Sequence, residues 1–421
     1  MRKMKDSGVE WLGEIPKDWA LIRFKDKYKN TKEIAKEQAS NYERLALTLG
    51  GVVKRPKDDS EGLQPKEFDG YQILRENDFV FKMIDLQNVS TSRVGLSPYT
   101  GLVSPAYIRF SPKEPCQYNR FVYYFLMSLY YNQVFNNLGG NGVRSALSAK
   151  DMGEFLMPYP SKNEQQKICA LIDNKTERIS WLIFNVQAQI EKLKAYKQSL
   201  ITEVITKGLD PNVPMKDSGV EWIGEIPKCW NMVRGKALFE ECDARSDDGS
   251  EELLTVSQYT GVTPRSQKSV NMFESTTLEG YKICEVGDIA ANTMWLWAGA
   301  IGVSEYRGVI SPSYNVYRQK EIKYISSYLD CLLRIPLLVQ EYASRSTGIR
   351  ASRLRLYPKD FMDIMFPVPP IEEQKTIMDI LGKKIDMVNQ MISIKQSKIE
   401  KLELYKRSLI YEYVTGKKEV S

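Results

Sequence analysis

The sequence predicts an α+β protein built as a pseudo-twofold tandem repeat, in which two mixed α/β modules are joined by two long helices that form an antiparallel coiled coil. Met4–Trp19 recurs as Met215–Trp230 with two substitutions, at an offset of 211 residues in a chain of 421. Each copy is followed by a module of variable length, and each half ends in a segment of fixed length with helical periodicity. A repeat this long indicates two domain-sized units, because solenoid repeats recur every 20–50 residues.

The repeat continues in the same order through both halves and divides the chain into four parts. Its later members are FDGY (68–71) with LEGY (278–281), GLVSPAY (101–107) with GVISPSY (308–314), and NGVR (141–144) with TGIR (347–350). The offset varies between 206 and 210 in these pairs but stays at 209 from Glu164–Gln165 onward. We therefore predict modules at residues 1–157 and 212–366, and long-helix segments at residues 158–211 and 367–421.

The fixed-length segments have the periodicity of amphipathic helices. Residues 163–207 contain neither Gly nor Pro, and Gly208 and Pro211 mark the end of the predicted helix. A second helix is predicted from Glu372 to about Thr415, with Gly382 as a local weak point. The apolar stripes comprise Ile168, Ile172, Ile179, Leu182, Val186, Ile190, Leu193, Tyr196, Leu200 and Val204, and then Ile377, Leu381, Ile385, Val388, Ile392, Ile399, Leu402, Tyr405 and Leu409.

A helix of this length cannot bury a narrow apolar stripe by itself. Packing of each helix along its own module is one alternative, but it does not explain two copies of equal length. We therefore predict that the two helices pair with each other. A twofold axis perpendicular to them would make the pair antiparallel and would place the modules at opposite ends of a rod.

The variable modules read as mixed α/β structure. Leu102–Phe110 and Val309–Arg318 alternate like strands between Gly and Pro, and we expect each SPxY to be a buried strand with a turn rather than a contact surface. Tyr118–Phe135 and Tyr324–Tyr342 read as amphipathic helices, the second interrupted by Pro336.

Composition excludes several classes of function. Histidine is absent, which disfavours His-based hydrolysis and most zinc sites. The six cysteines lack metal-ligand spacing, so we expect reduced thiols in a cytoplasmic protein. No apolar run is long enough for a membrane helix, and the first residues do not resemble a signal peptide. The net charge of +6 is compatible with a polyanionic partner but is weak evidence alone.

Motifs for catalysis are missing. The sequence has no phosphate loop, no dinucleotide fingerprint, no Asn/Asp-Pro-Pro-aromatic tetrapeptide, and no nucleophile with a general base beside it. These absences favour a binding protein over an enzyme, with no catalytic, cofactor or metal residue in this chain.

Candidate DNA-binding residues lie in loops rich in basic and amide side chains, which can read base edges or position phosphates. We expect Trp295 and Trp297, in one of these loops, to belong to the core. Residues 344–358 contain neither Asp nor Glu, which disfavours local ion pairing of their arginines. The candidates are Lys82, Gln87, Asn88, Asn141, Arg144, Asn292, Thr293, Arg345, Arg350, Arg353 and Arg355.

In its tandem plan the chain resembles the specificity subunits of type I restriction–modification systems. The likeness rests on the two DSGVEWxGEIPKxW segments, the two GxxSPxY segments, the Pro-rich segments before the Glu-Gln helices, and the KLxxYKxSLI helices. It covers essentially the whole chain, in order and in duplicate.

The resemblance implies a non-catalytic DNA-specificity subunit with two target recognition domains, each reading one half of a split, asymmetric site in double-stranded DNA. The paired helices would set the gap and dock two methyltransferase subunits, with two restriction subunits (translocase and nuclease) in the larger complex. S-adenosylmethionine, ATP and Mg²⁺ would belong to those partners. Two alternatives are a stand-alone DNA methyltransferase or nuclease with divergent motifs, and a two-domain scaffold with no nucleic-acid role.

Overall fold

The computed structural model describes residues 2–58, 67–83, 93–115, 117–138, 146–268, 277–348 and 354–420. The chain separates into unit 1, Met1–Gln187 with Ser397–Ser421, and unit 2, Ala188–Gln396. Both long helices contribute to both units, so the predicted boundaries between modules and helices stay predictions.

Unit 1 contains short strands and helices before the first long helix, α5 (Lys162–Lys207). In chain order they are β1 (Met4–Asp6), β2 (Glu14–Pro16), β3 (Ala20–Arg23), α1 (Phe24–Lys27), β4 (Tyr28–Asn30), η1 (Lys36–Asn41), β5 (Arg44–Thr48), β6 (Gly51–Arg55), β7 (Gln72–Leu74), β8 (Phe79–Lys82), β9 (Arg93–Leu96), β10 (Gly101–Val103), β11 (Ile108–Pro112), α2 (Arg120–Tyr131), α3 (Val134–Leu138), α4 (Ala149–Glu154) and β12 (Leu156–Tyr159).

Two four-stranded sheets form the body of unit 1, in the orders β6-β5-β10-β7 and β4-β11-β8-β9. The prediction of one strand over Leu102–Phe110 is wrong, because β10 and β11 lie in different sheets. The chain crosses between the sheets at a turn in which the amide of Tyr107 donates to the carbonyl of Ser104. Pro105 and Ala106 are exposed at this turn, so the expected burial of SPxY is also wrong.

Unit 2 repeats this plan and ends with the second long helix, α10 (Ile371–Val414). Its other elements are β13 (Met215–Asp217), β14 (Glu225–Pro227), β15 (Asn231–Arg234), α6 (Gly235–Leu238), β16 (Phe239–Cys242), β17 (Leu254–Ser257), β18 (Gly261–Pro264), η2 (Arg265–Gln267), β19 (Lys282–Cys284), β20 (Ile289–Ala291), η3 (Leu296–Ala298), β21 (Ile301–Val303), β22 (Gly308–Ile310), β23 (Asn315–Gln319), α7 (Ser326–Leu333), α8 (Pro336–Arg345), α9 (Pro358–Met362) and β24 (Met365–Val368).

The strand pairing of unit 2 matches that of unit 1. The sheet β16-β23-β20-β21 corresponds to β4-β11-β8-β9. The hairpin β17-β18 and the pair β19-β22 together correspond to the sheet β6-β5-β10-β7. The parallel bridge between Leu253 and Val309 joins these two pairs, just as the bridge between Arg44 and Leu102 joins β5 and β10. Pro336 begins α8, which is why the predicted helix over Tyr324–Tyr342 is two helices.

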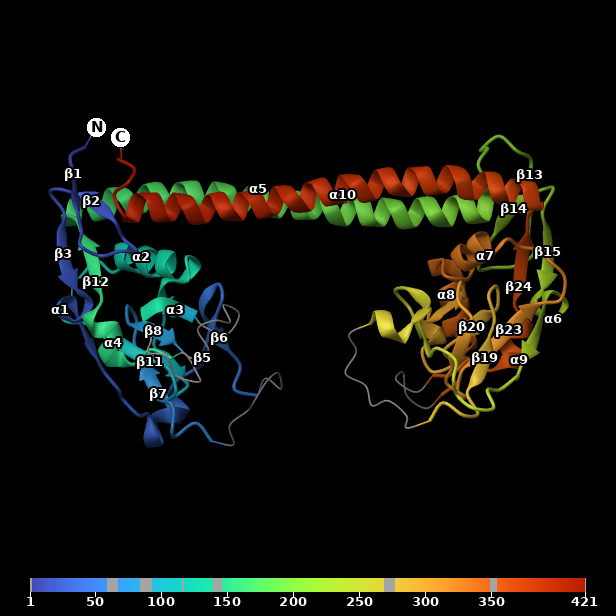
Figure 1. Ribbon diagram of the computed structural model, residues 1–421, viewed down its shortest axis with the longest axis horizontal. Helices are drawn as coiled ribbons and strands as arrows, with labels where there is room; N and C mark the ends of the chain where they lie inside the picture. Colours follow the sequence, from blue (N-terminus) through green and yellow to red (C-terminus); the bar gives the residue numbers. More distant parts are fainter. Residues whose placement is uncertain are drawn as a thin grey trace. The chain divides into compact units, whose positions relative to one another are not determined.

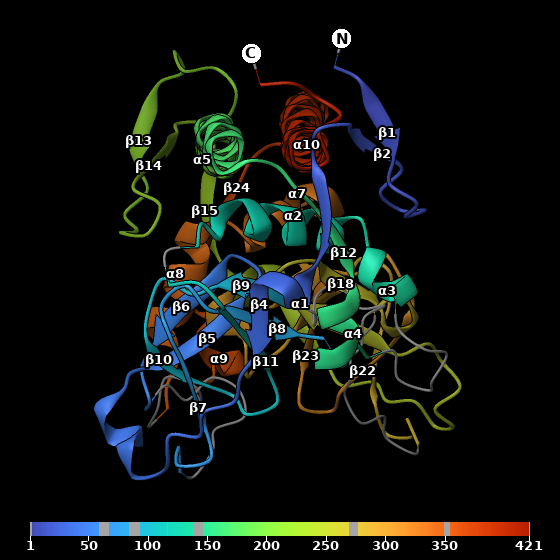
Figure 2. The same cartoon turned by 90° about the vertical axis from the view of Figure 1, so that its left-hand side faces the viewer.

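The long helices are confirmed as predicted, and within each unit they pair in opposite directions. In unit 1 the ammonium of Lys175 donates to the hydroxyl of Tyr413, and Lys406 donates to Ser180. In unit 2 Lys395 donates to the side chain of Gln189, and Lys197 donates to the side chain of Asn389. Partner numbers fall along α10 as they rise along α5, so the pairing is antiparallel. Figures 1 and 2 show α5 and α10 side by side over α2 in unit 1.

A buried glutamine explains the Glu-Gln repeat at the start of each helix. The amide nitrogens of Gln165 and Gln374 donate to the carbonyls of Pro160 and Pro369, at 2.9 Å in both cases. Each buried amide therefore joins the first turn of its helix to the Pro-rich segment before it. At the other end, Gly208 and Gly416 have φ of +76° and +71°, a left-handed conformation that commonly ends helices.

Three residues of the predicted stripes lie outside the buried face. Leu182, Tyr196 and Tyr405 are 40%, 56% and 52% exposed, whereas Ile179, Val186 and other stripe residues are buried. The two tyrosines are equivalent in the repeat, so the same position is uncovered in both copies.

Candidate nucleic-acid interface

The predicted contact residues fall into two groups. Lys82, Asn292, Thr293, Arg345 and Arg355 are described by the structure. The remaining predictions lie outside the described residues and stay predictions; they are Gln87, Asn88, Asn141, Arg144, Arg350 and Arg353.

Lys82 and Asn292 occupy the same position in the two units, at the end of β8 and directly after β20. Lys82 lies opposite Arg93 across the β8–β9 ladder. Asn292 is buried and donates from its amide to the hydroxyl of Tyr314 at 2.9 Å. Thr293 donates from its hydroxyl to the carbonyl of Ser313 at 2.7 Å. In the observed structure both side chains after β20 therefore hold the loop against the SPxY turn, and their contact with DNA stays a prediction.

This loop carries an exposed tryptophan, which corrects the expectation that its tryptophans belong to the core. Trp295 is 51% exposed. Its ring stacks on that of Trp297, with centroids 5.8 Å apart and planes 25° apart. The indole nitrogen of Trp297 donates to the carbonyl of Met294 at 3.0 Å, and Gly299 closes the loop with φ of +88°. The exposed ring is therefore presented by a fixed loop.

The arginines after α8 differ in their surroundings. Arg345 donates to the carboxylate of Glu341 at 2.6 Å, one helical turn away. The expectation that this segment lacks a local carboxylate is therefore wrong for Arg345, because Glu341 lies just before residue 344. Arg355 is exposed, and its backbone pairs with that of Thr347.

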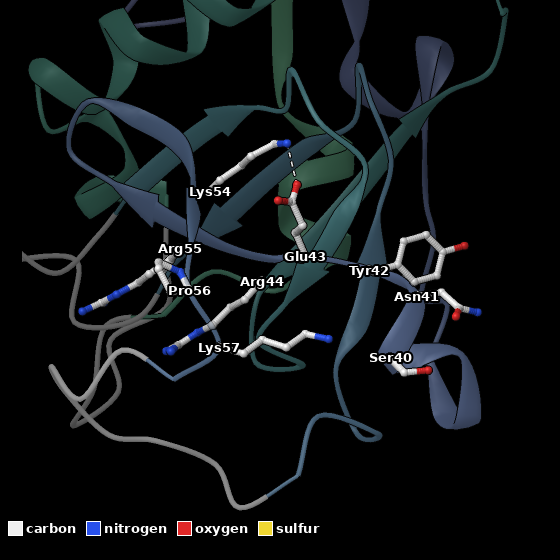
Figure 3. A pocket seen from close by; sticks show the side chains of 9 residues that line it. All are labelled: Ser40, Asn41, Tyr42, Glu43, Arg44, Lys54, Arg55, Pro56 and Lys57. Carbon is white, nitrogen blue, oxygen red and sulfur yellow. Dashed lines mark ion pairs between the residues drawn. The ribbon is translucent and has the colours of Figure 1, made fainter.

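The β5–β6 hairpin of unit 1 forms a basic hollow that the sequence interpretation missed. Arg44 lies opposite Arg55 across the hairpin, and their side chains extend to the same side (Figure 3). Glu43, the carboxylate residue among the described lining residues, pairs with Lys54 at 2.5 Å. The hollow is lined by Ser40, Asn41, Tyr42, Glu43, Arg44, Lys54, Arg55, Pro56 and Lys57.

A second hollow, of about 500 Å³, lies beside the first and shares Arg44 and Arg55 with it. Arg93, Tyr71 and Tyr107 also line it, together with Ser104 of the SPxY turn, and no described lining residue carries a carboxylate. Burial raises the pKa of the Tyr107 hydroxyl, while the nearby Arg93 and Arg44 oppose that rise. Three arginines thus converge on one hollow rimmed by hydroxyl groups, which is a suitable surface for a polyanion.

The described residues do not suggest metal or thiol chemistry. No group of three or more His, Cys, Asp or Glu among them is placed to hold a metal ion. Burial raises the pKa of the Cys169 and Cys284 thiols to about 12, which disfavours the reactive thiolate. No helix among the described residues combines the length and apolarity needed to cross a membrane.

Comparisons with known proteins agree on one class. Residues 16–192 match the family model of the type I restriction modification DNA specificity domain. The type I restriction enzyme MjaVIII specificity subunit of Methanocaldococcus jannaschii is 22% identical over 419 residues, which cover 96% of this chain and 93% of the relative.

A solved structure shows the same fold. A chain from a structure on the complex assembly and conformational transition of the type I R-M system superposes with a TM-score of 0.63 at 14% identity, covering 95% of this chain and 98% of that one. The HsdS subunit from Thermoanaerobacter tengcongensis covers 98% of this chain with a TM-score of 0.47. Together the comparisons make this chain similar to type I restriction–modification specificity subunits. The resemblance found in the sequence is confirmed.

Proposed function

We propose that each unit reads one half of a split, asymmetric site in double-stranded DNA, and that the paired helices set the length of the unread gap. The observation that carries this proposal is one scaffold present twice with chemically different side chains at equivalent positions. Strand pairing is the same in the two units, whereas Arg44 and Lys82 of unit 1 are replaced by Leu253 and Asn292 in unit 2. Two units with the same strand pairing and different side chains are suited to reading two different half-sequences.

The chain itself acts without catalysis in this proposal. Methylation would be carried out by two methyltransferase subunits that bind S-adenosylmethionine. Cleavage would require two restriction subunits that use ATP and Mg²⁺. Crosslinking the assembled complex to radiolabelled S-adenosylmethionine should label the methyltransferase, and labelling of this chain would favour an enzyme instead.

The long helices offer a docking surface for two identical partners. Tyr196 and Tyr405 are exposed at equivalent positions, as are Leu182 and Met391, each pair being 209 residues apart. Exposed apolar side chains repeated in both copies suit one kind of partner bound twice. Replacement of both tyrosines by Ala should reduce co-purification of the methyltransferase with this chain. Undiminished co-purification would place docking elsewhere.

Mapping of methylated bases across the genome, in cells with and without this chain, tests the main proposal. We expect one split motif to lose methylation when the chain is deleted and to regain it when the gene is restored. An uninterrupted motif, or an unchanged methylation pattern, would contradict the proposal.

A further inference from the structure

The two units place chemically different side chains at the same positions of one scaffold. Arg44 forms a parallel bridge to β10, and Leu253 forms the equivalent bridge to β22 in unit 2. Arg93 pairs with Lys82 across the β8–β9 ladder, and Ala300 pairs with Asn292 at the same place in unit 2. The two pairs are equivalent because Gly95 and Gly302 pair with equivalent residues of β8 and β20. Two positions that are cationic in unit 1 are therefore neutral and apolar in unit 2.

The cations of unit 1 are not common to both copies of the scaffold. Arg44 faces Arg55 and Lys82 faces Arg93 across antiparallel strands, and like charges directly opposite each other destabilise a sheet. Unit 2 forms the same strands with Leu253 and a shorter side chain at residue 300. Arg44, Arg55 and Arg93 converge on one hollow that has no carboxylate among its described lining residues, and such a surface suits a polyanionic ligand.

Arg44 is shared by the two hollows of the hairpin. The residue is 9% exposed and lines both of them. Its guanidinium carbon lies 5.8 Å from the ring centre of Phe68, which positions the group. Arg55 and Arg93 complete the second hollow.

Unit 2 presents an aromatic ring near the corresponding place. Trp295 follows Asn292 in the loop that rests on the SPxY turn, and the hydrogen bonds from Asn292 and Thr293 fix that loop. At the positions equivalent to Arg44, Arg55 and Arg93, unit 2 retains one cation, because Arg265 pairs with Leu253 where Arg55 pairs with Arg44. An exposed indole can contact a thymine methyl group or stack on a base, and neither contact releases counterions from phosphates.

We infer that the two units hold their half-sites by different forces: unit 1 mainly through phosphate contacts from Arg44 and Arg93, and unit 2 with a larger share from the ring of Trp295. This inference rests on the proposed function. It predicts that the two halves of one DNA site respond differently to salt.

The test uses the complete chain in complex with its methyltransferase, and duplex DNA that carries the split site found by methylation mapping. Dissociation constants are measured by fluorescence anisotropy between 50 and 200 mM KCl. Two variants exchange a cation for the residue of the other unit, Arg44→Leu and Arg93→Ala. Each should flatten the slope of log K against log salt by about 0.9, the value for one lost phosphate contact. Arg44→Lys keeps the charge and should keep the slope.

Trp295→Ala should leave the salt slope unchanged and weaken binding roughly tenfold, as expected for one lost stacking or apolar contact. Trp295→Phe should retain most of the affinity. When the unit 1 half-site is scrambled, Arg44→Leu should keep its effect on the salt slope, because phosphate contacts carry no sequence information, and Trp295→Ala should keep its effect on affinity. Melting by circular dichroism identifies any variant that fails to fold.

The outcomes separate this inference from the proposed function. An unchanged salt slope in folded Arg44→Leu and Arg93→Ala, with sequence-specific binding intact, overturns the inference alone. A reduced slope in Trp295→Ala also overturns it. If the unaltered complex binds every duplex equally, the proposed function fails as well.

Discussion

Two equivalent ion pairs differ in their access to water. In unit 1 the guanidinium of Arg109 lies 2.5 Å from the carboxylate of Asp78, and the two side chains are 4% and 3% exposed. In unit 2 Arg318 contacts Asp288 at 2.7 Å, but the arginine is 47% exposed. Each pair joins neighbouring strands of one sheet, the sheet that contains β8 in unit 1 and β20 in unit 2. Removal of the arginine should therefore lower the free energy of unfolding more in unit 1 than in unit 2.

We predict that Arg109→Ala lowers the free energy of unfolding of unit 1 by about 3–5 kcal/mol, because it leaves a buried carboxylate without its partner. Arg318→Ala is the matched control and should cost less, since water can reach the site of the lost guanidinium. Urea unfolding gives the size of each loss, and hydrogen exchange of the β8 and β20 amides assigns it to a unit. Equal losses in the two variants would contradict this account.

The thiols provide a second test at the residue scale. Burial raises the pKa of Cys169 and Cys284 from 9.0 to about 12, whereas Cys229 is exposed. Iodoacetamide at pH 8 should label Cys229 in the folded chain and should reach the other two only after unfolding. Unfolded thiols ionise near pH 9, so these two groups should lower stability as the pH rises from 9 towards 12. Rapid native labelling of Cys169 would show that its site opens.

The basic hollow was predictable from a signal in the sequence. Gly50–Gly51 between two alternating runs indicates a hairpin, and its register sets Arg44 opposite Arg55. The contribution of Arg93 was not predictable, because it depends on how a distant strand packs against that hairpin. Exposure of Trp295 depends likewise on bonds to the SPxY turn, which sequence spacing does not encode.

At the scale of elements, the glycine of each GxxSPxY segment has a steric reason. A Cβ on Gly101 would lie 2.7 Å from the carbonyl oxygen of Glu43, and one on Gly308 would lie 2.3 Å from that of Glu252. Both glycines lie where β10 and β22 approach a neighbouring parallel segment. The repeated glycine thus permits the close contact that holds the hairpin to the rest of its unit.

We predict that Gly308→Ala destabilises unit 2 by about 1–3 kcal/mol or more, because the backbone oxygen can move away only if the strands separate. Gly382→Ala is the control, since nothing lies within 4 Å of its Cβ and alanine favours a helix by about 0.8–1 kcal/mol. Thermal unfolding should show opposite shifts for the two variants. A neutral Gly308→Ala would mean that the hairpin is loosely held.

The helices were easier to predict than the strands. Periodicity over more than forty residues averages out local exceptions, so α5 and α10 begin and end within one residue or so of the expected bounds. Tyr196 and Tyr405 were wrongly assigned to the buried stripe, because a helix of 3.6 residues per turn drifts against a seven-residue step. The strand over Leu102–Phe110 was misread because a surface turn with Pro looks, at short range, like an interruption within one strand.

At the scale of the whole molecule, the repeat predicts two similar units, and insertions concentrate in the parts that differ. The long helices have 46 and 44 residues, and their sequences keep one offset of 209 residues. The base sequence that each unit reads cannot follow from the repeat, because base contacts depend on side-chain geometry within the variable parts.

The length of the paired helices gives the last prediction. One heptad is inserted after Gln187 in α5 and another after Gln396 in α10, close to the contact of Gln189 with Lys395. Seven residues add about 10 Å and turn the helix face by only about 20°, so pairing should survive. If the helices set the gap, the preferred spacing should lengthen by about three base pairs at 3.4 Å each, while both half-sequences stay the same. Methylation mapping gives the spacing directly. The same seven residues placed after Asp210, outside both helices, should leave the gap unchanged; an unchanged gap in the helix variant as well would exclude the helices as the ruler.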